Sequence, residues 1–135
     1  MATQALSAAT ALDLGRLASQ VEGGLPVRAL GDLLEHLDVS QAALAVALGI
    51  PERTLHRRLK ASGRLPVSES ERVGRLSRLY HLAVRTLGTP ARARAWLDSK
   101  PKALGGRTPL AVAATEPGAR LVEQVLGRIE HGVFS

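Results

Sequence analysis

The sequence of 135 residues contains no cysteine, which excludes disulfide bonds and thiolate metal sites. Aromatic residues are also scarce, and Trp96, Tyr80 and Phe134 are the only ones. No stretch of the sequence approaches the ~20 consecutive apolar residues that a membrane-spanning helix needs. The N-terminal residues lack the basic start and apolar core of a secretion signal. These absences predict a soluble cytoplasmic chain that does not engage a membrane.

Strong helix formers are abundant instead, whereas aromatic residues make up only 2% of the chain. Ala, Leu, Val and Arg dominate, so a β-sheet would have few of the side chains that favour strands. The length suits one compact domain or two small ones that share a core. The sequence therefore predicts an all-α fold.

The net charge of +6 is unevenly distributed along the chain. Residues 1–40 carry a net charge of −3, residues 41–64 carry +4, residues 65–105 carry +5 and residues 106–135 are neutral. A basic middle between less basic ends indicates two different surfaces for two different partners.

Apolar spacing, capping residues and glycine or proline stops predict where the helices lie. Residues 1–24 are expected to form a flexible N-terminal arm, with at most one helical stretch over residues 11–21. Further helices are expected over residues 27–37, 41–48, 52–60 and 68–87, then after Pro90, after Thr108, and from Thr115 to Gly132. These helices divide the rest of the chain into residues 25–66, 67–98 and 99–135.

The helix over residues 68–87 is the longest one expected. Ser68 and Glu71 have the spacing of a capping box, in which each side chain accepts from an N–H group at the helix start. The apolar residues of this helix exceed what one buried stripe needs, so part of it, Leu79 included, is expected at a dimer contact. In the last helix, Leu121, Val122, Val125 and Ile129 are expected to face inward.

Two short helices with a glycine turn between them are expected over residues 41–60, and the second is strongly basic. Ser40 can cap the first helix, and Gly49 can adopt the positive φ that the turn requires. This pattern is typical of a helix-turn-helix, whose second helix enters the major groove of DNA. Polar groups on that helix can contact phosphates or base edges. The candidate DNA-binding residues are Arg53, Thr54, His56, Arg57, Arg58 and Lys60.

One position of the second helix departs from the usual pattern. Arg58 stands three residues after Leu55, where many such motifs bury an apolar residue, and Leu59 follows it. This indicates a helix rotated slightly about its axis. The alternative interpretation is that residues 52–60 form a basic helix that only faces solvent. The serine cap and the glycine turn before it favour the helix-turn-helix.

Three stretches of the C-terminal third closely resemble the toxin-binding domain of Xre/ParS-type antitoxins. They run from Leu104 to Leu110, from Thr115 to Arg120 and from Gly127 to Phe134. With the upstream helix-turn-helix and the long helix, the resemblance covers about residues 25–135. The terminal stretch is the specific part, because helix-turn-helix motifs occur in repressors of every kind.

This resemblance implies an all-helical antitoxin without catalytic activity, cofactor or metal. It implies a homodimer that binds operator DNA, represses its own operon and neutralises a RES-domain toxin, which degrades NAD or transfers its ADP-ribose. Residues 25–66 would then be the DNA-binding region, residues 67–98 the linking and dimerisation helices, and residues 99–135 the toxin-binding domain. The candidate toxin-binding residues are Arg107, Thr108, Arg128, Glu130, His131, Val133 and Phe134.

The residues themselves leave other interpretations open. The glycines at 105 and 106 could form an ordinary loop, with Arg107 a surface charge and Phe134 folded back on the core. The chain could also be a stand-alone transcription regulator whose C-terminal helices only dimerise it. An enzyme is disfavoured, because there is no Gly-rich phosphate loop and adjacent helical residues such as Glu130 and His131 point about 100° apart. No two of the four histidines have the spacing of a metal pair on a helix.

Overall fold

The computed structural model describes residues 14–132, and in this part of the chain helices joined by loops are the regular elements, without a strand. The expected all-α fold is thus confirmed. The helices are α2 (Leu14–Glu22), α3 (Arg28–Leu37), α4 (Gln41–Leu48), α5 (Glu52–Leu59), α6 (Val67–Leu87), α7 (Pro90–Leu97), the 3-10 helix η1 (Lys102–Leu104), α8 (Pro109–Val112) and α9 (Glu116–Glu130).

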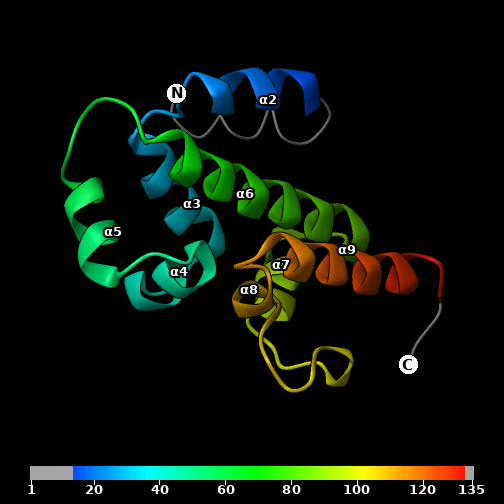
Figure 1. Cartoon of the computed structure of the whole chain (residues 1–135). Helices are drawn as coiled ribbons and strands as arrows, with labels where there is room; N and C mark the ends of the chain where they lie inside the picture. Colours follow the sequence, from blue (N-terminus) through cyan, green and yellow to red (C-terminus); the bar gives the residue numbers. More distant parts are fainter. Residues whose placement is uncertain (1–13, 133–135) are drawn as a thin grey trace.

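Helix α6 runs through the middle of the molecule, with the other helices packed around it (Figure 1). It contacts α2, α3 and α4 on the N-terminal side and α7 and α9 on the C-terminal side. Its buried apolar residues follow helical spacing; they are Val73, Leu76, Leu79, Tyr80 and Ala83. One continuous hydrophobic core therefore joins the two halves of the chain.

Two expectations for α6 are wrong. Leu79 is only 1% exposed within the single chain, so it belongs to the chain's own core and not to a surface contact with a second copy. The capping box at Ser68 and Glu71 does not form, because the helix begins at Val67 after Pro66 and has no side-chain cap. The Pro66 carbonyl already accepts from the Ser70 N–H at 2.9 Å, so Ser68 lies inside the first turn.

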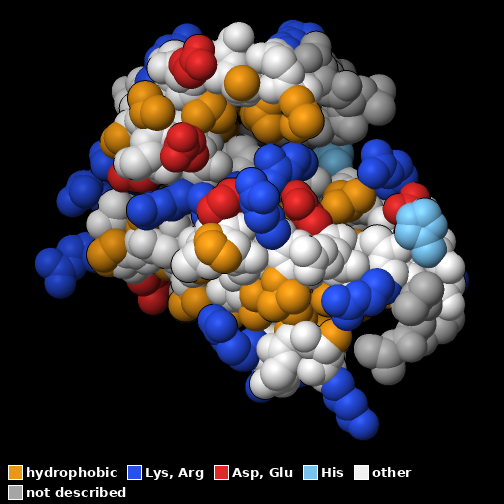
Figure 2. All heavy atoms as spheres, turned by 45° about the vertical axis from the view of Figure 1, so that its right-hand side comes forward, with side chains coloured by type: hydrophobic (Ala, Val, Ile, Leu, Met, Phe, Trp, Pro, Cys, Tyr) orange, Lys and Arg blue, Asp and Glu red, His pale blue; other side chains and the backbone are white. Residues whose placement is uncertain are grey.

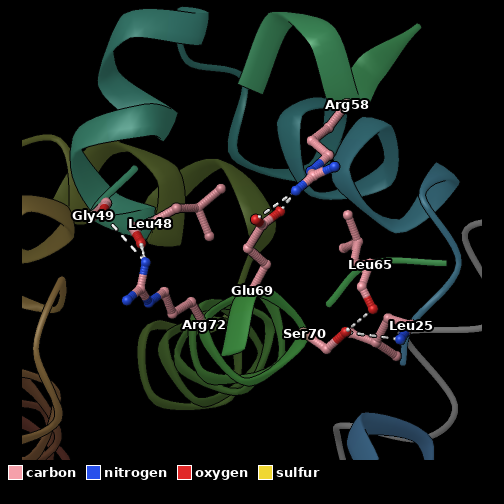
Figure 3. Close-up of polar contacts among 8 residues, drawn as sticks. All are labelled: Leu25, Leu48, Gly49, Arg58, Leu65, Glu69, Ser70 and Arg72. Atoms are coloured by element: carbon pink, nitrogen blue, oxygen red, sulfur yellow. Dashed lines mark hydrogen bonds and ion pairs between the residues drawn. The ribbon is translucent and has the colours of Figure 1, made fainter. Parts of the chain in front are cut away.

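The segment before α3 pairs with the segment before α6. The Leu65 N–H donates to the Leu25 carbonyl at 2.8 Å, and the Val27 N–H donates to the Gly63 carbonyl at 2.9 Å. Buried Ser70 accepts from the Leu25 N–H at 2.9 Å through its Oγ (Figure 3). These bonds satisfy backbone groups that no helix serves, and they fix α3 beside the start of α6.

The first described helix belongs to this packed body. Helix α2 corresponds to the helical stretch expected over residues 11–21, and its Leu17 is 6% exposed. It lies along α6 (Figure 1), where Gly74 leaves room for Leu17 and Val21. Residues 14–22 are thus part of the fold and not of a flexible arm, because Leu17 is buried. Residues 1–13 lie outside the described residues.

Helix α9 packs its inner face on α6 and α8. Val122 and Val125 are buried as expected, and Ile129 is half-buried. Leu121 is 38% exposed, so its expected inward orientation is wrong. Helical spacing instead buries Ala119 and Leu126 beside the two valines. Within residues 14–132, no helix is both long and apolar enough to cross a membrane.

Candidate functional site

The basic segment forms a helix-turn-helix from α4 and α5. The Ser40 Oγ accepts from the Ala43 N–H at 3.1 Å and so begins α4. Gly49 ends it with φ +67°, a conformation that costs glycine little and other residues more. Leu44, Leu48 and Leu55 are each at most 2% exposed and hold the two helices on the core. Both helices and the turn that sequence analysis predicted are therefore present.

The outer face of α5 presents cations to solvent. Arg53, His56 and Arg57 are exposed, as is Lys60 immediately after the helix, while Thr54 is half-buried. The His56 ring lies 3.3 Å from Gln41 Oε1, measured from its Nδ1, so it also joins α5 to the first turn of α4. This face can contact phosphates and base edges without any rearrangement of the core.

Arg58 has a different environment from the other basic residues of α5. Its Nε and Nη2 each donate to Glu69 of α6 at 2.9 Å (Figure 3). The side chains are only 28% and 15% exposed, and the hydrogen bond to Glu69 raises the pKa of Arg58. The guanidinium takes the inward position where a helix-turn-helix often places an apolar residue. Arg58 therefore fixes α5 to α6, and its assignment as a DNA contact does not fit this geometry.

Arg72 of α6 supports the turn between α4 and α5. Its Nη1 lies 3.5 Å from the Leu48 carbonyl and 3.3 Å from the Gly49 carbonyl (Figure 3). A cation at these carbonyls complements the partial negative charge at the end of α4. Sequence analysis did not identify this residue, because backbone carbonyls are acceptors at every position and leave no pattern in the sequence.

The C-terminal region is built on two capped helices. Thr108 Oγ1 accepts from the Ala111 N–H, and Thr115 Oγ1 accepts from the Gly118 N–H, both at 3.1 Å. Gly118 is required where α9 passes α8, because a Cβ there would overlap the Val112 carbonyl oxygen. Thr108 is half-buried and serves as a cap, so its structural role is evident from the geometry.

The other candidate toxin-binding residues lie in two places. Arg107 is exposed in the loop between η1 and α8. Arg128, Glu130 and His131 are exposed at the end of α9. Two further candidates, Val133 and Phe134, lie outside the described residues.

The surface along α9 and the facing part of α6 carries charges of both signs. Figure 2 shows Lys or Arg and Asp or Glu side chains interleaved in a band across this face, with hydrophobic side chains gathered above and below it. The ion pairs between α6 and α9 account for part of this mixture: Arg75 with Glu116 at 3.3 Å and Arg78 with Glu123 at 3.0 Å. In residues 14–132, no group of three or more His, Asp or Glu is arranged to hold a metal ion.

The position of α5 relative to the end of α9 decides whether both surfaces can be occupied at the same time. Figure 1 shows α5 at one side of the molecule and the C-terminal end of α9 at the opposite side. A macromolecule bound on one of these surfaces would therefore leave the other surface accessible.

Two family models together match most of the chain. The Antitoxin Xre-like helix-turn-helix domain matches residues 16–78. The Antitoxin Xre/MbcA/ParS C-terminal toxin-binding domain matches residues 82–132. The boundary between these matches falls inside α6, the helix that the two halves share.

Similar proteins of bacteria carry the name Antitoxin Xre. The one from Yersinia enterocolitica is 36% identical over 120 residues, which cover 88% of this chain and 81% of the relative. That of Photorhabdus laumondii is 32% identical over 113 residues, covering 83% and 76%. That of Pseudomonas putida is 32% identical over 83 residues, covering 62% and 52%. With its helix-turn-helix and its toxin-binding domain, the chain belongs to the Xre family of antitoxins.

Proposed function

We propose that this antitoxin binds operator DNA of its own operon as a homodimer and inhibits a RES-domain toxin that consumes NAD. The observation that carries the proposal is the presence of a helix-turn-helix and a toxin-binding domain in one chain, with α5 and the end of α9 on opposite sides of the molecule (Figure 1). The chain itself acts by binding, without catalysis.

The DNA-binding surface in this proposal is the outer face of α5. Arg53, Arg57 and Lys60 supply the charge that neutralises phosphates, and Thr54 and His56 lie among them. Arg58 is withdrawn from this set because Glu69 holds its guanidinium. Because each phosphate contact releases a counterion, binding should weaken steeply as salt rises.

The toxin-binding surface in this proposal comprises the loop at Arg107 and the end of α9 with the residues after it. Arg107 is a planar donor suited to a carboxylate or phosphate. Arg128, Glu130 and His131 are exposed, as a contact surface requires, and Val133 and Phe134 would extend the contact. Thr108 contributes as the cap that positions the loop.

Deletion of residues 128–135 tests the proposal. The buried residues of α9 end at Leu126, so the deletion removes no fully buried residue of the described chain. We expect the shortened protein to bind DNA like the full chain and to lose neutralisation. The measurements are growth of cells that express the toxin encoded beside this gene, an NAD assay on the purified pair, and a gel shift with the duplex upstream of the gene.

Point variants sharpen the same test. Anchors buried at an interface typically cost about 2 kcal/mol or more when truncated, so Arg107→Ala and Phe134→Ala should each release toxin activity in a titration. Arg85→Ala, at an exposed arginine near the end of α6, is the matched control and should protect fully. Full protection by the shortened protein would contradict toxin binding by this region and favour a stand-alone regulator.

A further inference from the structure

Three arginines recur at every third position of α6: Arg72, Arg75 and Arg78. Residues three apart on a helix lie on neighbouring parts of one face. Each arginine contacts a different segment: Arg72 contacts the turn after α4, Arg75 the junction of α8 and α9, and Arg78 the second turn of α9. This face of α6 therefore contacts both binding regions of the chain.

The contact of Arg72 is made with the segment that sets the direction of α5. α5 has eight residues and only one, Leu55, is fully buried. Its orientation therefore also depends on polar contacts, namely the Arg58–Glu69 pair and the contacts that hold the turn before it. Arg72 Nη1 binds the carbonyls of Leu48 and Gly49, the last groups before the chain turns into α5. Hydrogen bonds from a charged donor are stronger than neutral ones and carry directional preference.

The contact of Arg75 is made with the segment that sets the start of α9. Its Nη1 donates to the Ala114 carbonyl at 3.2 Å, and its Nε lies 3.3 Å from Glu116 Oε2. The side chain of Arg75 is only 14% exposed, whereas that of Glu116 is 51% exposed, so the bond to the Ala114 carbonyl is the better shielded from water. Glu116 is the first residue of α9, whose far end carries the proposed toxin contacts.

The two contacted segments also touch each other. α4 packs against α8, and a Cβ added to Gly49 would lie 3.8 Å from the Ala114 carbonyl oxygen. The turn of the helix-turn-helix and the junction of α8 and α9 are thus adjacent, with one arginine of α6 contacting each of them.

We infer that Arg72 and Arg75 are positioning residues, Arg72 for the DNA-reading helix and Arg75 for the toxin-binding helix. Neither side chain touches DNA or toxin in this scheme; each acts through the backbone carbonyls that it holds. The inference rests on the proposed function, because it takes α5 as the DNA-reading helix and the end of α9 as the toxin contact.

The test compares Arg72→Gln and Arg75→Gln with Arg85→Gln in the full-length protein. All three changes remove one positive charge, so the long-range attraction of DNA falls about equally. Among residues 14–132, exposed Arg85 makes none of the hydrogen bonds or ion pairs that its two counterparts make. The probes are the duplex upstream of the gene, a shuffled duplex of the same length, and the toxin encoded beside the gene.

We expect Arg72→Gln to reduce the preference for the upstream duplex over the shuffled one about tenfold, with the toxin titration unchanged. We expect Arg75→Gln to raise the amount of antitoxin needed for neutralisation, with DNA preference unchanged. Arg72→Lys should recover most of the preference, because one ammonium nitrogen can donate to both carbonyls, as the single Nη1 does.

Several results would overturn the inference. The first is an Arg72→Gln protein that prefers the upstream duplex as strongly as Arg85→Gln does. The second is that each of the variants at 72 and 75 loses both DNA preference and toxin neutralisation. The third is that either glutamine variant fails to fold, as measured by circular dichroism. Arg57→Ala separates this inference from the proposed function. If Arg57→Ala loses DNA binding while Arg72→Gln keeps its preference, only the positioning role is wrong. If Arg57→Ala binds normally, the assignment of α5 as the reading helix is wrong.

Discussion

The side chain of His36 forms a cluster with two rings of α6, Tyr80 and His81. Its ring stacks on Tyr80 with centroids 5.3 Å apart and meets His81 edge-on at 6.1 Å. Burial lowers the pKa of His36, and the charge of His81 lowers it further, against smaller opposing effects of Asp32 and Glu35. Burial raises the pKa of nearby Asp32. Both groups are therefore more easily kept neutral in the folded chain than in the unfolded one.

Acidification should destabilise the protein through His36. Its pKa in the folded state lies below the unfolded value of 6.5, so the unfolded chain binds a proton first as the pH falls. The contribution of His36 to the free energy of unfolding is thus fully present above that value, and it declines as the pH drops through it towards the folded pKa. Urea unfolding at about pH 7.5 and about pH 5.5 measures this loss. We expect His36→Gln to reduce the difference in the free energy of unfolding between the two pH values. If the difference is as large in that variant, other groups cause it. Asp32 acts in the opposite direction, since protonation of a carboxyl whose folded pKa is raised favours the folded state.

Because Arg58 pairs with Glu69, we expect its substitution to affect stability, whereas substitution of Arg57 should affect DNA binding. Arg57→Ala should reduce the slope of log affinity against log salt by about 1, because one phosphate contact is lost. Arg58→Met should instead lower the melting temperature and leave that slope unchanged, because Glu69 holds the guanidinium. Glu69→Gln is the matched variant and should reproduce the lower melting temperature without altering α5. A slope reduced as much by Arg58→Met as by Arg57→Ala would make Arg58 a phosphate contact.

At the scale of single elements, two serines near the start of α6 have unequal roles. Ser70 is 0% exposed, accepts from the Leu25 N–H and donates to the Leu65 carbonyl at 3.4 Å. Ser70→Ala should cost about 1–3 kcal/mol, because it leaves a buried N–H without its acceptor. Ser68→Ala should change the free energy of unfolding by less than about 0.5 kcal/mol, because Ser68 is exposed and caps nothing. Equal losses in chemical denaturation would contradict this reading of the α6 start.

Helix α9 contains two glycines inside its length that should respond oppositely to alanine. A Cβ at Gly118 would overlap the Val112 carbonyl oxygen, so α8 and α9 would have to separate. We expect Gly118→Ala to cost about 1–3 kcal/mol. Nothing lies within 4 Å of a Cβ at Gly127, so Gly127→Ala should stabilise the helix by about 0.5–1 kcal/mol. Thermal unfolding of both variants measures this, and destabilisation by both would show that α9 does not tolerate alanine in general.

For the whole molecule, the arrangement of α5 and the end of α9 predicts that DNA and toxin bind together. These surfaces lie on opposite sides of the chain (Figure 1), so neither partner occupies the other's place. A gel shift of the upstream duplex with antitoxin should therefore move to a slower band when toxin is added. Antitoxin without residues 128–135 should give the first band only. Release of the duplex by toxin would show that the two partners compete.

The positions of the helices could be predicted from the sequence because the signals are local. Ser40, Thr89, Thr108 and Thr115 each bond an N–H three residues on, and Gly49 takes the positive φ at the end of α4. Both partners of such bonds lie within one helical turn, so neither depends on how the helices pack. For this reason, the all-α class and the two helices of the DNA-binding motif could be predicted from the sequence.

Other features depend on segments far apart in the sequence. The partner of Arg58 is eleven residues away, and the carbonyls that Arg72 and Arg75 hold are between 23 and 39 residues away. Leu79 and Leu121 have the same side chain, yet one is buried and the other 38% exposed. Bonds within single turns, which can be read from the sequence, fixed the starts of the capped helices α4, α7, α8 and α9. An ion pair or a buried contact requires two segments to meet. The packing of α6 against α2, α3, α4, α7 and α9 therefore set which arginines support the two binding regions and which ones remain available to DNA or toxin.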